Sequence, residues 1–184
     1  MNKKKTSKRD LLLAAANQIV LEQGAAQLTL DAVASDAGVS KGGLLYHFPS
    51  KEALISGMIE HAIDDFERRI DDIFATLPNA HGRWLHAFVE ASFDDDDISP
   101  PVFTAMTTAI ANRPDLLQPL QSRLNQWIEK AAADGVPVET VQLVVAATNG
   151  VWLERIFWHD ASHERLKKSL LSLITESAKN RSRE

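Results

Sequence analysis

Helical spacing of apolar residues extends along almost the whole chain, and it limits the possible folds more than any other feature. The clearest example is the segment 51–75, whose large apolar residues repeat at steps of three and four: Ile55, Ile59, Ile63, Phe66, Ile70 and Phe74. This spacing places them on one face of an α-helix. The alternating patterns of β-strands are nearly absent. The sequence therefore predicts an all-α fold.

Glycine, proline and capping residues divide this pattern into separate helices. We expect helices at about 7–23, 30–37, 41–47, 51–75, 81–93, 100–112, 114–133, 137–158 and 161–179. Gly24 and Gly38 are suitable C-terminal stops, and Thr29, Ser40 and Ser50 can cap the helices that follow them. The first three helices form a head over residues 1–50. Residues 51–184 form a body, which is a bundle of about six helices.

Charge is divided unevenly between these two parts. Residues 1–51 carry seven Lys/Arg and four Asp/Glu, whereas residues 52–184 carry thirteen and twenty-one, within a formal net charge of −5. A basic end beside an acidic body suits a protein that presents one end to phosphates. An ordinary basic tail on an acidic domain is the alternative. The leading cluster Lys3–Lys5, Lys8 and Arg9 is thus either a DNA-contacting arm or a solubilising tail.

Several classes of protein are disfavoured by what the sequence lacks. The chain has no cysteine, which excludes disulfides and thiolate chemistry. No apolar run approaches the roughly 18 residues of a membrane span, and the basic start lacks the apolar core of a signal peptide. Glycine-rich phosphate loops, H-E-x-x-H and nucleophile elbows are also absent. We therefore expect a cytoplasmic protein with no membrane partner, no cofactor, no catalytic residues and no enzymatic activity.

The segment LTLDAVASDAGVSKGGLLYHFPSKEAL, residues 28–54, carries the clearest functional pattern. It is typical of two short helices joined by a tight turn at Gly38, with Leu44 and Phe48 anchoring the second helix. The outward residues of that helix are Lys41, Gly42, Gly43, Leu45, Tyr46 and His47. This mixture suits a short helix that enters a DNA major groove. A helical hairpin within any small bundle is the alternative.

This segment resembles the helix-turn-helix signature of the TetR family of transcriptional regulators. The matching residues are Thr29, Ala32, Val33, Ala34, Ala37, Gly38, Val39, Ser40, Gly42, Leu44, His47, Phe48, Ser50, Lys51, Glu52 and Leu54. With the preceding helix, the resemblance covers about residues 8–55. It implies a DNA-binding head and a helical body that senses a ligand and dimerises.

The resemblance also implies a set of DNA-binding residues: Thr29, Ser40, Lys41, Gly42, Gly43, Leu45, Tyr46, His47 and Lys51. Within this set, Thr29 and Lys51 would contact phosphates, and Lys41 would face base edges together with the two glycines. Tyr46 and His47 would contact the DNA backbone. The sequence departs from the family at Leu45, where the commonest residue is tyrosine. Leucine cannot donate a hydrogen bond to a phosphate, but it can contact a thymine methyl group.

Dimerisation is expected through the last two helices, at about 137–158 and 161–179, because the resemblance implies a four-helix interface there. The segment 141–151 is apolar on nearly all sides, which is typical of a helix that is deeply buried or packs on a partner. The candidate interface residues are Val141, Val144, Val145, Thr148, Trp152, Leu166, Leu170, Leu173 and Ile174. A symmetric homodimer would pair naturally with a palindromic operator.

The body also contains many large rings that suit a pocket for a hydrophobic effector. The candidate pocket residues are Trp84, Phe88, Phe103, Met106, Trp127, Asn149 and Trp152. Aromatic residues that simply fill the core are the alternative. Asn149 is a polar candidate because a buried amide needs hydrogen-bond partners, and the dimer mate is an equal possibility for it.

Two acidic or histidine-containing segments have weak metal-binding character. Asp94–Asp97 is a run of four carboxylates, which suits a divalent cation, but without the spacing of a defined site a solvated acidic loop is the favoured interpretation. His159 and His163 lie four residues apart, a spacing that can bring two imidazoles to one helical face. Exposed residues at a helix start are the alternative, and we expect no metal site.

These patterns predict a ligand-responsive repressor that binds a DNA operator as a homodimer. An effector would shift the fourth helix and change the separation of two heads that must match major grooves about 34–36 Å apart. The alternative is a DNA-binding regulator that has no effector or that is controlled by a protein partner.

Overall fold

The computed structural model describes residues 7–94, 113–157 and 163–181, and all regular elements in these ranges are helical. The first elements are α1 (Lys8–Gln23), the 3₁₀ turn η1 (Ala25–Gln27), α2 (Leu30–Asp36) and α3 (Lys41–His47). The following elements are α4 (Lys51–Thr76), α5 (Arg83–Ser92), the 3₁₀ turn η2 (Pro114–Leu117), α7 (Gln118–Ala133), α8 (Val138–Phe157) and α9 (Glu164–Arg181). The predicted all-α fold is confirmed.

The ends of the first helices follow the local sequence signals. Ser7 Oγ accepts a hydrogen bond from the Asp10 amide at 3.1 Å, and the Asp10 carboxylate accepts one from the Ser7 amide at 3.1 Å. This reciprocal pair is a capping box. Thr29 Oγ1 accepts from the Ala32 amide at 3.2 Å at the start of α2. Gly24 ends α1 with a φ of +85°, which glycine adopts without a steric penalty.

Several helix boundaries differ from the sequence expectation. α5 begins at Arg83 rather than at 81, because Gly82 adopts a left-handed conformation with a φ of +77°. α8 begins at Val138, because the first backbone hydrogen bond of this helix is donated by the Val141 amide to the Pro137 carbonyl. Pro114 begins a 3₁₀ turn instead of an α-helix. The expected helix at 100–112 lies outside the described residues.

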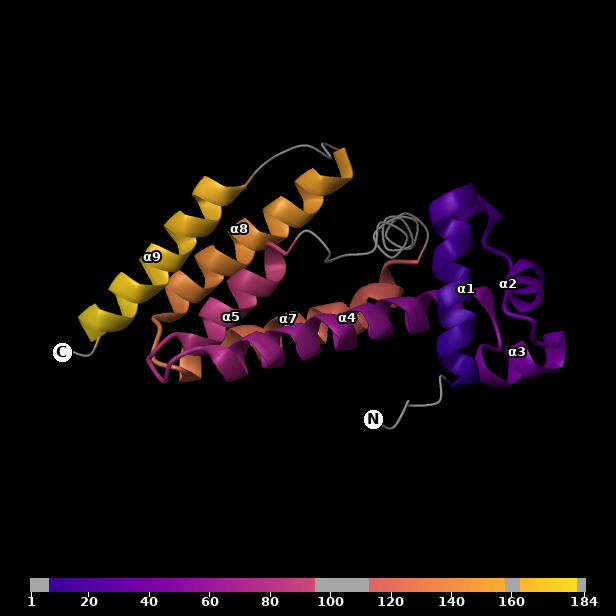
Figure 1. Cartoon of the computed structure of the whole chain (residues 1–184), viewed down its shortest axis with the longest axis horizontal. Helices are drawn as coiled ribbons and strands as arrows, with labels where there is room; N and C mark the ends of the chain where they lie inside the picture. The colour runs from indigo at the N-terminus through magenta and orange to yellow at the C-terminus, as the bar shows by residue number, and fades with distance from the viewer. Residues whose placement is uncertain (1–6, 95–112, 158–162, 182–184) are drawn as a thin grey trace. The chain divides into compact units, whose positions relative to one another are not determined.

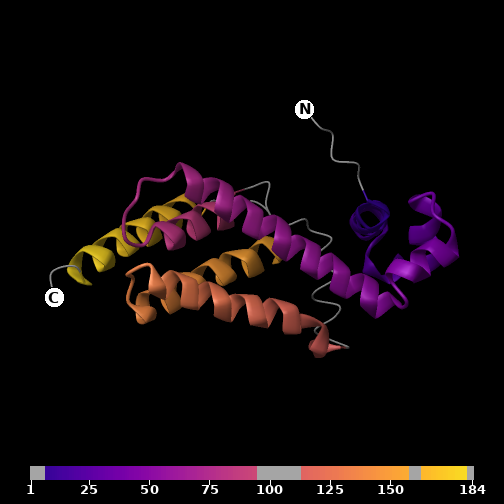
Figure 2. The same ribbon diagram turned by 90° about the horizontal axis from the view of Figure 1, so that it is seen from below.

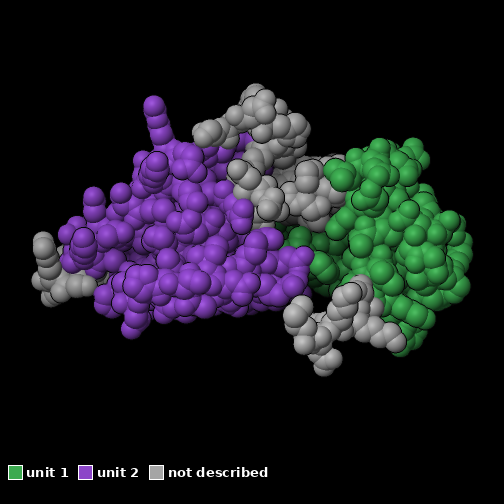
Figure 3. Space-filling view, in the orientation of Figure 1, with its two compact units in different colours: residues 1–62, 98–120 green, residues 63–97, 121–184 purple. Residues whose placement is uncertain are grey.

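The chain divides into two compact units (Figure 3). Unit 1 comprises residues 1–62 and 98–120, and unit 2 comprises residues 63–97 and 121–184. The sequence suggested a division after residue 50, whereas the first part of α4 belongs to unit 1. The packing explains this assignment, because Leu54 and Met58 of α4 are buried. The ring of Phe48 also lies against Gly57, where a Cβ would come within 2.6 Å of Phe48 Cε1.

Unit 2 brings together helices that lie far apart in the sequence. α5 packs against both α8 and α9, which lie side by side (Figures 1 and 2). Four large rings meet in the core: Phe66 of α4, Phe88 of α5, Trp127 of α7 and Trp152 of α8. We call these four residues the ring cluster. The Phe66 ring centroid lies 5.1–5.6 Å from the other three, which is contact distance for aromatic pairs.

Candidate functional site

α2 and α3 form a helix-turn-helix whose turn depends on Gly38. Its φ of +63° lies in the left-handed region, which L-residues with a Cβ rarely adopt. Val33 of α2 and Leu44 of α3 are fully buried, and Phe48 closes α3 with 3% of its surface exposed. These side chains hold the two short helices against α1, to which α2 lies adjacent in Figure 1. The anchoring roles predicted for Leu44 and Phe48 agree with this burial.

The outer face of α3 carries a compact set of unshielded groups. Ser40 caps the helix, and its Oγ accepts a hydrogen bond from the Gly43 amide at 3.2 Å. Lys41, Leu45 and Tyr46 are exposed, and Tyr46 presents 85% of its surface to solvent. The Tyr46 ring meets the half-buried His47 ring edge to face, with centroids 5.2 Å apart. α3 therefore offers a cation, an apolar group and two polar rings along one short helix.

The two adjacent glycines of α3 differ in how much space surrounds them. A Cβ at Gly43 would lie 2.9 Å from Val39 Cγ1 and 3.2 Å from Ser40 Oγ, so a side chain there would crowd the turn. A Cβ at Gly42 would meet nothing within 4 Å. Gly43 is therefore required by packing. Gly42 instead leaves a bare stretch of backbone on the exposed face, where another molecule can approach closely.

Lys41 has an acidic partner that the sequence analysis missed. Its Nζ lies 2.9 Å from Asp31 Oδ1 across the crossing of α2 and α3, and both side chains are largely exposed. The residues are ten apart in the chain, so neither helical periodicity nor a local motif signals the pair. Asp31 therefore offsets part of the positive charge of Lys41.

Two further members of the predicted set lie at helix starts. Thr29 is exposed as the N-cap of α2, and Lys51 is half-buried as the first residue of α4. The pKa of the neighbouring Glu52 lies below its ordinary value, because the Glu52 backbone amide and the Ser50 hydroxyl donate hydrogen bonds to its carboxylate. The first turn of α4 therefore already holds a carboxylate beside Lys51.

Family comparisons identify both halves of this architecture. Residues 7–58 match the family described as "Bacterial regulatory proteins, tetR family". Residues 82–178, more than half of the chain, match the family described as "Tetracyclin repressor-like, C-terminal domain".

The chain belongs to the TetR family. This family consists of DNA-binding transcriptional regulators, so the chain belongs with regulators and not with enzymes. The expected resemblance is thereby confirmed.

Individual relatives agree with this assignment. The chain is 25% identical over 122 residues to the HTH-type transcriptional regulator EthR of Mycolicibacterium smegmatis, a match that covers 66% of this chain and 56% of EthR. It is 31% identical over 130 residues to the nucleoid occlusion factor SlmA of Photobacterium profundum, which covers 70% of this chain and 64% of SlmA. The aligned stretches thus span less than two thirds of these relatives.

Solved structures show the same fold. A transcriptional regulator from Rhodococcus sp. Rha1 superposes with a TM-score of 0.75 at 21% identity, over 95% of this chain and 97% of that chain. The multidrug binding protein EbrR, solved in complex with ethidium, superposes with a TM-score of 0.68 at 20% identity, over 91% and 99%.

The pocket residues expected in this TetR-family chain fall into different environments. Phe88, Trp127 and Trp152 belong to the ring cluster, and Trp84 stacks on Phe88 with centroids 5.7 Å apart. The indole of Trp127 donates a hydrogen bond to Glu67 Oε1 at 2.9 Å. Asn149 is half-buried on α8. Phe103 and Met106 lie outside the described residues.

Most of the expected dimer-interface residues face inward. Six of them are buried within the chain itself: Val141, Val144, Val145, Thr148, Leu170 and Ile174. Because their side chains are already covered within the chain, they are not accessible to a second chain. Trp152 and Leu173 are half-buried, and Leu166 is exposed. α8 does have an exposed apolar surface, but that surface is formed by residues other than these candidates.

The remaining expectations concern metals and membranes. No group of three or more His, Cys, Asp or Glu side chains suited to a metal ion occurs in the described ranges. His163 Nε2 lies 3.6 Å from Glu154 Oε2, whereas His159 and residues 95–97 lie outside those ranges. Within the part of the chain that the structure covers, no helix is long and apolar enough to cross a membrane.

Proposed function

We propose that this chain is a repressor that binds a palindromic DNA operator through α3. The observation that carries the proposal is the outer face of α3, where Lys41, Leu45 and Tyr46 are exposed to solvent while Leu44 is fully buried. Cationic, apolar and hydrogen-bonding groups on one short helix match the groups that a major groove displays. Thr29, Ser40, Gly42, Gly43, His47 and Lys51 complete the proposed contact surface.

The proposed roles divide into base and phosphate contacts. Lys41 is the long donor at the N-terminal end of α3, where recognition helices contact base edges. Leu45 supplies an apolar contact for a thymine methyl group. Tyr46 and Lys51 contact phosphates, which position the protein without reading sequence. Because few side chains reach the bases, sequence-dependent DNA shape supplies part of the specificity.

The direct test uses DNA taken from upstream of the chain's own gene. Fluorescence anisotropy at one fixed salt concentration compares that DNA with a scrambled duplex of equal length. We expect at least 10³-fold tighter binding to the upstream DNA, which is the usual minimum for specific operators. Equal affinity for the two duplexes would contradict the repressor proposal.

The homodimer is proposed to form through the exposed apolar face of α8. Leu143 and Leu153 expose 57% and 53% of their surfaces, and Ala146 and Gly150 between them are also exposed. Their spacing of three, four and three residues places them on one side of the helix. Leu166 of α9 is exposed as well. A second copy of the same surface would bury these groups symmetrically.

A matched pair of charge substitutions tests the dimer. Leu143→Glu introduces a carboxylate at the proposed interface, whereas Leu21→Glu does so at an equally exposed leucine of α1, where 58% of the surface is exposed. Sedimentation velocity at micromolar concentration should give a dimer for the wild type and Leu21→Glu and a monomer for Leu143→Glu. A dimer in all three proteins would exclude this face of α8.

The effector is proposed to be a small hydrophobic molecule that binds in unit 2 and weakens operator binding. The support is the concentration of aromatic side chains there together with the fold shared with EbrR, whose ligand ethidium is aromatic. Adding such a molecule should lower operator affinity. A ligand has this effect when it binds more tightly to the conformation that binds the operator more weakly.

An effector-independent regulator is the second candidate, and the ring cluster favours it. Phe66, Phe88 and Trp127 expose no more than 4% of their surfaces and contact one another, as a packed core does. A thermal-shift screen with ethidium and other aromatic compounds distinguishes the candidates. A ligand that prefers the native state raises the melting temperature, and no shift with any compound supports the second candidate.

A further inference from the structure

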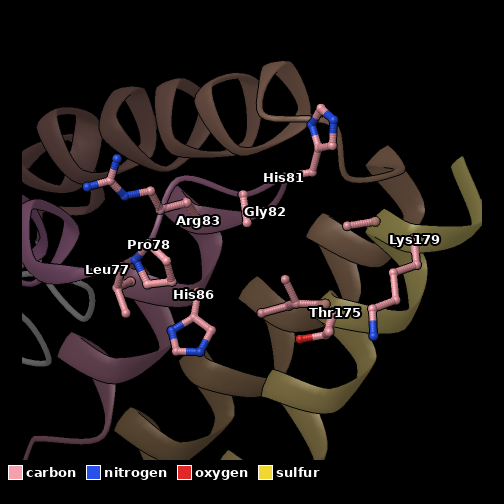
Figure 4. A pocket seen from close by; sticks show the side chains of 11 residues that line it. Leu77, Pro78, His81, Gly82, Arg83, His86, Thr175 and Lys179 are labelled. Carbon is pink, nitrogen blue, oxygen red and sulfur yellow. The ribbon is translucent and has the colours of Figure 1, made fainter. Parts of the chain in front are cut away.

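A separate cavity of about 450 Å³ lies in unit 2, between the loop that joins α4 to α5 and the C-terminal half of α9 (Figure 4). Leu77, Pro78 and Ala80 form its wall on the loop side, and Ile174 and Ala178 form its wall on α9. None of its lining residues belongs to the ring cluster. The volume falls within the range of about 300–1,000 Å³ that is usual for small-molecule sites.

The polar groups around this cavity are cations and neutral donors. His81, Arg83, His86, Thr175 and Lys179 line it, and no Asp or Glu side chain of the described residues does. Figure 4 shows His86, Thr175 and Lys179 at the border of the open space. Lys179 has no acidic partner within the described part of the chain. Positive charge beside an apolar wall favours an anionic ligand that carries a hydrocarbon group.

Two buried nitrogens at the cavity lack a hydrogen-bond partner. They are Arg83 Nε and His86 Nδ1, and neither has an acceptor or donor among the described residues. The Arg83 guanidinium is nevertheless fixed, because its Nη2 donates to the Phe74 carbonyl and its Cζ lies 4.0 Å from the Phe74 ring centroid. Buried polar atoms without partners are uncommon in native proteins. A ligand in the cavity that bears an oxygen acceptor would satisfy His86 Nδ1, whereas the Arg83 side chain extends away from the open space (Figure 4).

The loop wall of the cavity is held in place by a second set of contacts. The Gly82 amide donates to the Asp134 carbonyl at 2.9 Å, and the Trp84 amide donates to Asp134 Oδ2 at 2.7 Å. A Cβ at Gly82 would lie 2.8 Å from Ile174 Cγ2, so the loop and α9 approach closely there. The cavity therefore has a fixed shape on the side where its apolar wall lies.

We propose that this cavity binds a small amphipathic carboxylate. The hydrocarbon part would lie against Leu77, Ile174 and Ala178, and the carboxylate would accept hydrogen bonds on the side of Lys179 and His86. This site is distinct from the aromatic residues that support the proposed effector, because none of its lining residues belongs to the ring cluster. Ligand binding at this site can be measured on the protein alone, so its test requires no DNA and is separate from the test of the repressor proposal.

Isothermal titration calorimetry on the full chain tests the ligand class with two probes. Sodium octanoate carries the proposed charge, and 1-octanol has the same chain length without it. We expect one octanoate per chain and an affinity at least tenfold higher than that of 1-octanol, because a hydrogen bond to a charged group is worth about one order of magnitude. Equal affinities, or no octanoate binding at millimolar concentration, would overturn the proposal.

Three variants locate the binding. Thr175→Trp fills the cavity from an exposed position on α9, and Lys179→Met removes the charge but keeps most of the apolar stem. Lys168→Met is the matched control, an exposed lysine of α9 that does not line the cavity.

The expected pattern identifies this cavity among other possible sites. Thr175→Trp should abolish octanoate binding, Lys179→Met should weaken it about tenfold without changing 1-octanol binding, and Lys168→Met should match the wild type. Thermal unfolding of each variant checks that the fold is kept. Octanoate binding at wild-type affinity in Thr175→Trp would place the ligand elsewhere and refute the site.

Discussion

α3 and the ring cluster use similar side chains in opposite ways. Tyr46 exposes 85% of its surface, whereas Phe88 exposes none and contacts the rings of Phe66, Trp127 and Trp152. Burial removes apolar area from water and so stabilises unit 2. Exposure leaves Tyr46 contributing little to folding but available to a partner. The two regions therefore divide the work: the ring cluster stabilises unit 2, and the exposed face of α3 is left for the proposed recognition of DNA.

Truncation of the cluster should have the largest effect on folding. Phe88→Ala removes a fully buried ring and should lower the free energy of unfolding by about 3–5 kcal/mol. Tyr46→Ala should change it by less than about 0.5 kcal/mol, since most of its ring is already in water. Urea denaturation of the full chain measures both. Similar losses for the two variants would refute the division between the regions.

Substitution on α3 should affect recognition instead of folding. Lys41→Met should weaken binding to the operator by about 1–3 kcal/mol, because it removes the proposed donor at the N-terminal end of α3. The exposed lysine of α9 changed in Lys168→Met serves as the control and should leave both affinity and stability unchanged. Fluorescence anisotropy gives the affinity. Equal affinity of Lys41→Met and the control would remove α3 from the DNA contact.

The cap at the start of α1 should contribute measurably to the stability of unit 1. Ser7→Ala removes the capping box of α1 and should cost about 1 kcal/mol of stability. The exposed Ser35 on α2 makes no side-chain hydrogen bond in the described structure, so Ser35→Ala is the matched control. Urea denaturation at neutral pH measures the difference, and equal stabilities would mean that the cap is unimportant.

The same cap predicts a pH dependence. Hydrogen bonds from the Ser7 hydroxyl and amide lower the pKa of Asp10 below its ordinary value of 3.8. Because the folded pKa is lower than the unfolded one, the contribution is complete above about pH 3.8 and is lost as the pH falls through the folded pKa. The stability gap between wild type and Ser7→Ala should therefore shrink below pH 3.8. A constant gap would contradict this linkage.

The smallest effect is expected at the partner of Lys41. Asp31→Asn leaves the shape of α2 intact and removes a surface ion pair, which contributes no more than a few tenths of a kcal/mol to stability. It also removes a negative charge beside the proposed DNA surface. Affinity should rise a few-fold for every DNA sequence, with a steeper dependence on salt. Weaker binding would show instead that Asp31 is needed to orient Lys41.

The sequence by itself determined the helices and the helix-turn-helix. The signals are local, because Ser7, Thr29 and Ser40 cap helices with their own side chains and Gly24 and Gly38 allow the backbone to turn. Such signals act over a few residues, so they can be read before any packing is known. Leu44 and Phe48 were assigned to the core for the same reason, since one face of α3 is apolar and the other is not.

Only the tertiary structure decided which faces of α8 and α9 turn inward. α8 is apolar on several sides, so periodicity alone does not separate the buried Val141 and Val144 from the exposed Leu143 and Leu153. The choice depends on where α5 and α9 lie against α8. The Lys41–Asp31 pair and the cavity beside Lys179 have the same origin. Each joins residues from different helices, and their contact is set by packing between helices rather than by local sequence.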